Sequence, residues 1–163
     1  MLGVDPVEEA RRHWEAHGWA AAAPGMAVVT AVMRVQQIFL ARAEEVLRPL
    51  GLTFARYEVL MLLLFSREGR LPLGKIGERL QVHAASVTNA IDRLERDGLV
   101  ERQPNPRDRR GTLARLTPKG RRLAERATVR LNDVFEAVPL DPGELDRLGG
   151  ALRTIRRDAG DFS

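Results

Sequence analysis

The sequence predicts a mainly helical fold that contains one small β-hairpin, and three observations support this prediction. Apolar side chains recur every three or four positions over most of the 163 residues, as on one face of a helix. Asp or Thr directly precedes Pro at three points, which is typical of a helix start because the first residue caps the helix and Pro fits its first position. Two short extended runs, 99–103 and 112–116, flank a loop rich in Pro, Arg and Asn.

Helices are expected to fill most of the chain in the order in which these signals occur. The apolar run 59–65 has no polar side, so we expect its helix to lie in the core. Pro24 and Gly25 predict a linker over residues 20–25, and Gly98 predicts a left-handed residue after a helix. The expected helices cover residues 6–18, 26–48, 54–67, 72–80 and 83–97, and two more begin at Pro118 and Pro142.

Two short helices joined by a tight turn at Gln81-Val82, and followed by a hairpin, predict a winged helix-turn-helix. We expect this winged region to cover residues 53–117. An added N-terminal helix and its linker precede it over 1–25. Apolar stripes run along the remaining helical regions, 26–52 and 118–163, and all of these parts are expected to form one compact domain.

The charge of the chain is concentrated in one segment. The whole chain has 26 basic and 22 acidic residues, a formal net charge of +4. Residues 102–122 hold eight arginines and lysines against Asp108 alone, which gives this segment +7 and leaves −3 for the rest. A local basic patch indicates a polyanionic partner such as a nucleic acid, and the alternative is a solvated loop and helix face.

The helix over 83–97 carries polar groups that suit contact with DNA. No Asp, Glu, Lys or Arg occurs between residues 81 and 91, so no carboxylate there repels a phosphate backbone. Its short donors and acceptors suit base edges in the major groove, and the arginines of the hairpin tip suit the narrow minor groove. The candidate DNA-binding residues are His83, Ser86, Thr88, Asn89, Arg107, Arg109 and Arg110.

Three stretches resemble the MarR family of bacterial transcription regulators: residues 80–100 (LQVHAASVTNAIDRLERDGLV), Asp108-Arg109-Arg110, and residues 116–120 (LTPKG). The resemblance implies a homodimer with one winged helix-turn-helix per subunit and a pseudo-palindromic operator in double-stranded DNA. It also implies repression that a small anionic or aromatic ligand relieves. The dimer interface of such proteins uses the terminal helices, so the regions 26–52 and 118–163 are the expected dimerisation region.

The added N-terminal helix resembles a subgroup of this family in which a Trp contacts the ligand. That subgroup includes urate-responsive regulators and regulators of trans-aconitate methyltransferase genes, and Trp14 and Arg93 match its ligand-sensing positions. The urate-responsive members have Asp where this chain has Glu58, and residues 56–60 and 73–78 look closer to the aconitate type. The resemblance therefore favours a tricarboxylate such as citrate or trans-aconitate, with urate or a phenolic acid as the alternative.

Glu58 is also unusual without any resemblance. Its neighbours at three and four positions in either direction are apolar, and a carboxylate buried on such a face needs a cation. Arg34 on the preceding helix and Arg93 are the candidate partners, so the predicted ligand site consists of Trp14, Arg34, Glu58 and Arg93. The alternatives are a structural ion pair for Glu58 and a core or interface position for Trp14.

Several function classes lack their signals in this sequence. With no Cys, no Gly-rich phosphate loop and no Gly-x-Ser-x-Gly, we expect neither an enzyme nor a cofactor. His13 and His17 stand four residues apart, but no third ligand follows, so no metal site is expected. The sequence lacks a run of about 18 apolar residues, so we expect no membrane span. Its acidic start is unlike a signal peptide, and we therefore expect a cytoplasmic protein. A helical protein–protein adaptor is the remaining alternative to a DNA-binding regulator.

Overall fold

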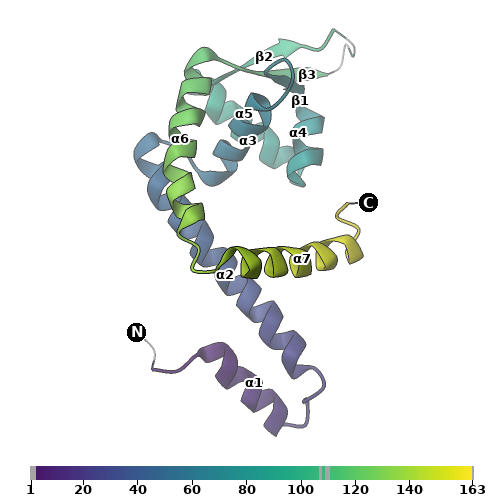
Figure 1. The fold of residues 1–163 in the computed structure, drawn as a ribbon. Helices are drawn as coiled ribbons and strands as arrows, with labels where there is room; N and C mark the ends of the chain where they lie inside the picture. Colours follow the sequence, from purple (N-terminus) through teal and green to yellow (C-terminus); the bar gives the residue numbers. More distant parts are fainter. Residues whose placement is uncertain (1–2, 107, 109–110, 163) are drawn as a thin grey trace. The chain divides into compact units, whose positions relative to one another are not determined.

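We describe the fold from a computed structural model of the chain, which describes residues 3–106, 108 and 111–162. The chain divides into two compact units, Met1–Leu131 and Asn132–Ser163. The expected mainly helical fold with a small antiparallel sheet is confirmed (Figure 1). In order, the elements are α1 (Pro6–Ala16), α2 (Ala23–Leu47), the 3₁₀ helix η1 (Arg48–Leu50), α3 (Phe54–Leu64), β1 (Arg70–Pro72), α4 (Leu73–Leu80), α5 (Ala84–Arg96), β2 (Val100–Pro104), β3 (Thr112–Leu116), α6 (Pro118–Glu136) and α7 (Pro142–Asp158).

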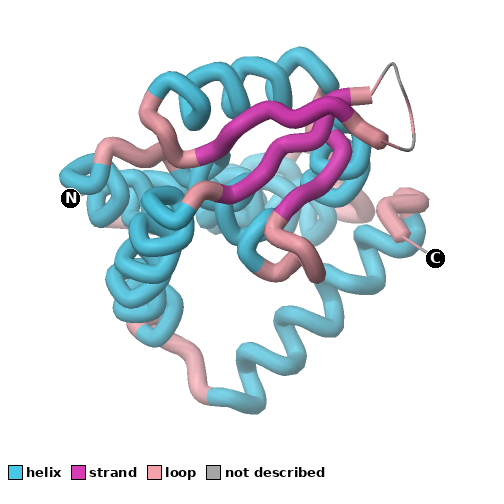
Figure 2. Tube along the Cα trace, turned by 90° about the horizontal axis from the view of Figure 1, so that it is seen from above, coloured by secondary structure: helices cyan, strands magenta, loops and turns pink. Residues whose placement is uncertain are grey.

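The described strands form one antiparallel sheet in the order β1-β3-β2 (Figure 2). Strands β2 and β3 form the expected hairpin, with Arg102 opposite Ala114. Strand β1 is an addition to the predicted fold, and it pairs with the other side of β3 through Leu71, also opposite Ala114. Three residues are too few to show an alternating pattern, and Pro72 is tolerated in β1 because this strand lies at the edge of the sheet.

Helix α3 lies in the core, as its apolar run predicts. Leu60 and Leu63 are fully buried, in one cluster with Ile76 of α4 and Ile91 of α5. The helix ends at Leu64 rather than at residue 67. The reason is a turn in which Gly69 adopts a left-handed conformation (φ 63°) and leads the chain into β1.

The expected linker over residues 20–25 is wrong in its second half, because α2 already begins at Ala23. Pro24 occupies the first turn of α2, where its missing N–H costs no hydrogen bond. The short connection from α1 is held by Trp19, whose N–H donates to the carbonyl oxygen of Trp14 at 2.9 Å. The two indole rings also meet edge to face, with centroids 5.4 Å apart. These contacts fix the added helix α1, which packs against α2.

Helix α2 leaves a broad apolar surface exposed. Only its ends are buried, through Ala23 at the start and Ala43 and Leu47 near the other end. An apolar patch of this kind marks an interaction surface in a folded protein. Its exposed side chains are Val28, Val29, Val32, Met33, Val35, Phe39 and Leu40.

The segment Ala23–Leu50 is also, by length and composition alone, apolar enough to cross a membrane, with a mean hydropathy of 1.3 in a window that is 6% buried. It is the single such segment in the part of the chain that the structure describes. Arg34 interrupts its middle, and an arginine at the centre of a bilayer costs about 2.5–3.5 kcal/mol. Ala43 and Leu47 pack into the core of the winged region. We therefore interpret α2 as a helix that meets another protein chain.

The second unit consists of the end of α6 and helix α7. Asp141 caps α7 as predicted: its carboxylate accepts the N–H of Glu144 at 2.9 Å, and the Glu144 carboxylate accepts the N–H of Asp141 at 2.9 Å. None of the residues of α7 is buried, and Leu145, Leu148 and Ile155 are exposed. Within its own unit, α7 thus carries an exposed apolar stripe.

Candidate nucleic-acid interface

The helix-turn-helix is formed by α4, a turn at Gln81, and α5. Gln81 adopts a left-handed conformation (φ 55°), which produces the predicted tight turn. Gly77 allows the two helices to approach, because a Cβ there would lie 3.2 Å from the carbonyl oxygen of Val82 and 3.3 Å from Cγ2 of Val87. This packing fixes the direction in which α5 projects.

The first half of α5 presents the four predicted contact residues on one exposed stretch. His83 caps the helix, since its Nδ1 accepts the N–H of Ala85 at 3.2 Å, which leaves Nε2 for an outside partner. Thr88 donates its hydroxyl to the carbonyl oxygen of Ala84 at 3.1 Å and keeps its acceptor positions. Ser86 and Asn89 are exposed as well. The contacts of these residues with DNA remain a prediction.

Two carboxylates in the second half of α5 are bound by one arginine of β2. The Nη2 of Arg102 lies 2.5 Å from Oδ1 of Asp92, and its Nη1 donates to Oε2 of Glu95. The backbone N–H of Arg102 also donates to Oε1 of Glu95 at 3.0 Å. Burial alone would lower the pKa of Arg102, but the two carboxylates raise it above its ordinary value. We call this cluster of Asp92, Glu95 and Arg102 the Arg102 clamp, and it joins the wing to α5.

The predicted basic patch is smaller than the charge count implies. Arg102 is neutralised in the clamp. Arg115 lies opposite Glu101 across the hairpin, with Nη1 3.5 Å from Oε1. Lys119 donates its ammonium to the carbonyl oxygen of Asp97 at 2.7 Å, at the end of α5. Three of the eight basic residues of the segment therefore have partners in or next to the winged region.

The other basic residues of the patch lie at the hairpin tip and on α6. Arg121 and Arg122 are exposed in the first turns of α6. Arg107, Arg109 and Arg110 lie outside the described residues, so their predicted DNA contacts remain predictions. Among the described residues of the segment, Arg121 and Arg122 offer their charge to a polyanion.

The four predicted ligand residues are spread over four helices. Trp14 is half-buried on α1 against Trp19, and Arg34 is exposed on α2, where its Nη1 donates to Oε1 of Gln37 at 3.2 Å. Glu58 is half-buried on α3, and Arg93 is exposed on α5. No hydrogen bond or ion pair joins any two of these four described side chains. Their role in ligand binding remains a prediction.

Glu58 does not have the cation that its apolar neighbours led us to expect. Neither Arg34 nor Arg93 pairs with it within the described chain, because Arg34 bonds Gln37 and Arg93 faces solvent. The carboxylate is half-buried rather than enclosed, so its desolvation is incomplete. Burial nevertheless raises the pKa of Glu58 above its ordinary value.

No group of three or more potential metal ligands occurs among the residues that the structure describes. His13 and His17 do share one side of the α1 end, with ring centroids 6.5 Å apart. The Nδ1 of His17 lies 2.7 Å from the carbonyl oxygen of His13, and the His17 ring stacks on Trp19 at 5.9 Å. The pair is thus part of an aromatic cluster.

The contact between the start of α6 and the turn that ends α5 was not predicted from the sequence. We call this contact the seat of α6. The Thr117 hydroxyl donates to the carbonyl oxygen of Gly98 at 2.8 Å and accepts the N–H of Gly120 at 3.0 Å. A Cβ on Gly120 would lie 2.1 Å from the carbonyl oxygen of Leu99. Glycine in the first turn of a helix lowers the stability of that helix. Its presence at position 120 is the one feature of the sequence that could have indicated a close backbone contact.

Comparison of the chain with known proteins finds matches in one family. The model of the MarR family matches residues 52–112. Among curated relatives, the HTH-type transcriptional regulator MhqR of Bacillus subtilis is 36% identical over 102 residues. That match covers 63% of this chain and 62% of MhqR, so the chain spans less than two thirds of this relative.

Solved structures match over more of the chain. Sco5413, a MarR family transcriptional regulator from Streptomyces coelicolor, is 51% identical, with a TM-score of 0.79 over 86% of this chain and 98% of that chain. Sco3205 of the same organism, in complex with DNA, is 25% identical, with a TM-score of 0.75 over 80% and 84%. CouR from Rhodococcus jostii RHA1, bound to p-coumaroyl-CoA, is 26% identical, with a TM-score of 0.70 over 78% and 90%.

Proposed function

The chain belongs to the MarR family of transcription regulators, and on this basis we propose that it binds an operator in double-stranded DNA and represses transcription in the cytoplasm. The observation that carries the proposal is the exposed face of α5. Residues 83–91 hold no charged side chain, and the carboxylates that follow, Asp92 and Glu95, are bound by Arg102. Residues 83–91 can therefore approach phosphates and base edges without charge repulsion, and Arg102 halves the negative charge that follows them. The structure of Sco3205 in complex with DNA supports the proposal.

The proposed form is a homodimer on a pseudo-palindromic operator. The exposed apolar side of α2 and the exposed apolar stripe of α7 support it, because surfaces of this kind in a folded protein mark an interface. They belong to the regions 26–52 and 118–163, the proposed dimerisation region. In the DNA-bound dimer the two α5 helices would lie about 34 Å apart, one turn of DNA.

The proposed signal is a small anionic ligand, and we favour a tricarboxylate such as citrate or trans-aconitate. Arg93 supports this choice because it is an exposed cation on α5, the same helix that carries the proposed base contacts. An anion bound to Arg93 can therefore bias the position of α5 and release the operator. Trp14, Arg34 and Glu58 would complete the site. No described contact joins these side chains to Arg93, so we propose that residues of both subunits of the dimer form the site together. A phenolic ligand is the second candidate, favoured by the p-coumaroyl-CoA complex of CouR.

Operator binding is tested with labelled DNA from the promoter region next to the gene of this protein. Fluorescence anisotropy between 50 and 200 mM salt should show affinity that falls steeply with salt, as phosphate contacts require. The Asn89→Ala variant should lose about 1–3 kcal/mol of operator binding if its amide contacts a base edge. Val4→Ala, at an exposed neutral residue outside the winged and proposed dimerisation regions, is the control and should bind as the unchanged protein does. Indifference to DNA at low salt would refute the proposal.

Ligand choice is tested by thermal unfolding with citrate, trans-aconitate, urate and p-coumarate. A ligand that binds the folded protein raises its melting temperature, by an amount that grows with ligand concentration. We expect the tricarboxylates to produce the largest shift and to release the operator in the anisotropy assay. Arg93→Ala should remove that response, whereas a full response in this variant with normal DNA affinity would exclude the proposed role of Arg93.

A further inference from the structure

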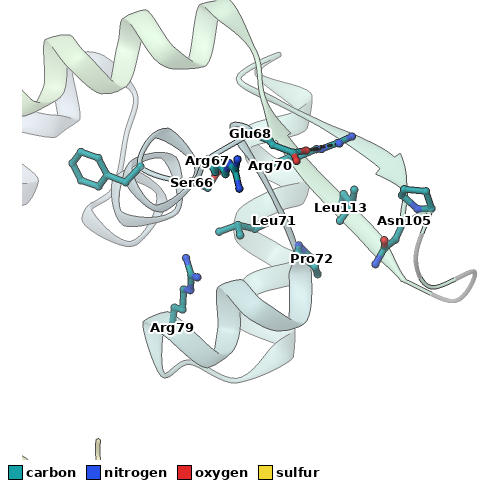
Figure 3. A pocket seen from close by; sticks show the side chains of 11 residues that line it. Ser66, Arg67, Glu68, Arg70, Leu71, Pro72, Arg79, Asn105 and Leu113 are labelled. Atoms are coloured by element: carbon teal, nitrogen blue, oxygen red, sulfur yellow. Dashed lines mark hydrogen bonds and ion pairs between the residues drawn. The ribbon is translucent and has the colours of Figure 1, made fainter.

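We propose that a cleft within the winged region binds a small organic anion with an apolar body, at a place separate from the proposed ligand residues. The cleft has a volume of about 440 Å³, within the usual range for small-molecule sites. It lies between the turn after α3, strands β1 and β3, the end of α4 and the start of the hairpin loop (Figure 3). The inference goes beyond the proposed function, because it concerns a second binding site.

The floor of the cleft is apolar. Leu71 and Pro72 of β1 and Leu113 of β3 line it, and Leu113 is only 7% exposed. Leu71 packs against the hydrophobic core from the other side. The floor is therefore a rigid part of the domain, formed by the paired strands β1 and β3.

Two cations, Arg67 and Arg79, also line the cleft. Glu78, the residue before Arg79, attracts it electrostatically, but the Glu78 carboxylate is bound by Lys75. Arg67 and Arg79 are exposed, and within the described chain neither makes a hydrogen bond or a salt bridge. Figure 3 shows the Arg79 side chain extending from α4 toward Leu71. The lining carboxylate, Glu68, is already held by Arg70, with Nε at 2.8 Å and Nη2 at 2.5 Å from Oε2. Two guanidinium groups beside an apolar floor are suited to a carboxylate on an apolar body.

Phe65 supports the apolar half of this assignment. It borders the cleft directly after α3, and its side chain is 78% exposed, the highest value among the large hydrophobic residues that the structure describes. An exposed aromatic ring beside a cleft gains free energy when an apolar body covers it. A DNA phosphate would use the two arginines but neither Phe65 nor the apolar floor, so we favour the organic anion.

The test is an amide NMR titration of the DNA-free protein with 2-naphthoate, a planar apolar body with one carboxylate. We expect chemical-shift changes at residues 66–71 and at Leu113. The double variant Arg67→Gln/Arg79→Gln should raise the dissociation constant at least about tenfold, because two charge-assisted contacts are lost. The matched control is Arg126→Gln, an exposed arginine of α6, which should bind as the unchanged protein does.

Two further probes separate the parts of the proposal. The neutral amide of 2-naphthoate and inorganic phosphate should each bind at least about tenfold more weakly than 2-naphthoate, since one lacks the charge and the other the apolar body. Unchanged affinity in the double variant, shifts at other residues, or equal affinity for phosphate would each overturn the proposal. An unchanged melting temperature of the double variant shows that it is folded, and the single variant Arg79→Gln serves if it is not. Because no DNA is present, failure to bind an operator would not affect the result.

Discussion

At the scale of one residue, Arg102 sets the charge next to the proposed DNA-binding face of α5. Its guanidinium pairs with both Asp92 and Glu95, on the helix that carries the proposed base contacts, so the cluster keeps one net negative charge instead of two. Its backbone N–H is held by Glu95 as well, so side chain and main chain of β2 are fixed to α5 together. Without Arg102, two uncompensated carboxylates would stand near the DNA backbone, and β2 would lose its link to α5.

The Arg102→Ala variant should therefore lose operator affinity by about tenfold or more, which corresponds to about 1.4 kcal/mol. The triple variant Arg102→Ala/Asp92→Asn/Glu95→Gln has no carboxylates to repel DNA, but β2 is still not linked to α5. The part of the operator affinity that this variant recovers measures the repulsion, and the part that it does not recover measures the link. Arg115→Ala is the control on the neighbouring strand, because it breaks one exposed pair, and such pairs contribute little. Anisotropy titrations measure all three variants, and unchanged affinity in Arg102→Ala would exclude a role for the clamp.

Glu58 links stability to pH at the same scale. Burial raises its folded-state pKa above the ordinary value of 4.5, and no described cation offsets this effect. A carboxyl with a raised pKa stabilises the fold while it is protonated, and this contribution is lost as the pH rises through the raised pKa.

Glu58→Gln should thus stabilise the protein at pH 7 and change little near pH 4, where the carboxyl is protonated in both states. Urea unfolding at the two pH values measures the difference. If Glu58→Gln instead destabilises the protein at pH 7, a cation from a second chain pairs with Glu58.

At the scale of elements, the seat of α6 depends on one glycine. Gly25 and Gly120 both occupy the third position of a helix, but a Cβ on Gly25 has nothing within 4 Å, and a Cβ on Gly120 would collide with the backbone of Leu99. The two positions therefore form a matched pair that differs in tertiary contact.

Gly120→Ala should destabilise the fold by about 1–3 kcal/mol, the usual cost of overpacking. Gly25→Ala should be neutral or stabilise by up to about 1 kcal/mol, because alanine favours helix. Chemical unfolding of both variants measures the difference. Equal stability of the two would show that α6 does not rest on Leu99.

The elements that the sequence predicted are those with local signals. Caps such as Asp141 and the apolar run of α3 mark helices within a few residues, and the turn-rich loop marks the hairpin. Strand β1 was not predicted, because its three residues form a strand only through pairing with β3. The Arg102 clamp was not predicted for the same reason, because residues 92, 95 and 102 come into contact only when β2 folds back along α5. The half-burial of Glu58 likewise depends on packing that no local pattern shows.

At the scale of the whole molecule, the exposed side of α2 is the surface at which the proposed homodimer would form. Val32 lies in the middle of this surface, and Ala41 follows nine positions later, half a turn around the helix at 3.6 residues per turn. A charge at the two positions therefore tests opposite sides of the same helix.

Val32→Asp should abolish the proposed homodimer, because it places a carboxylate in an apolar interface, whereas Ala41→Asp should leave the dimer intact. Sedimentation velocity measures the mass of each variant. The melting temperature of the unchanged protein should also rise with its concentration, as linkage to association requires. Dimers of equal strength in both variants would place the interface elsewhere.

The contact of Gly120 with Leu99 gives α6 the property of a lever. Between Gly120 and Leu131 the helix rises about 16 Å, so a sideways shift of about 3 Å at Leu131 corresponds to a rotation of about 10° at the fulcrum. The fulcrum is the turn that ends α5, where the carbonyl oxygen of Gly98 accepts the Thr117 hydroxyl. A small change in the angle of α6 would therefore be passed to the end of α5, the helix that carries the proposed base contacts. In the proposed homodimer, the distance between the two α5 helices would then depend on the angle of α6 in each subunit.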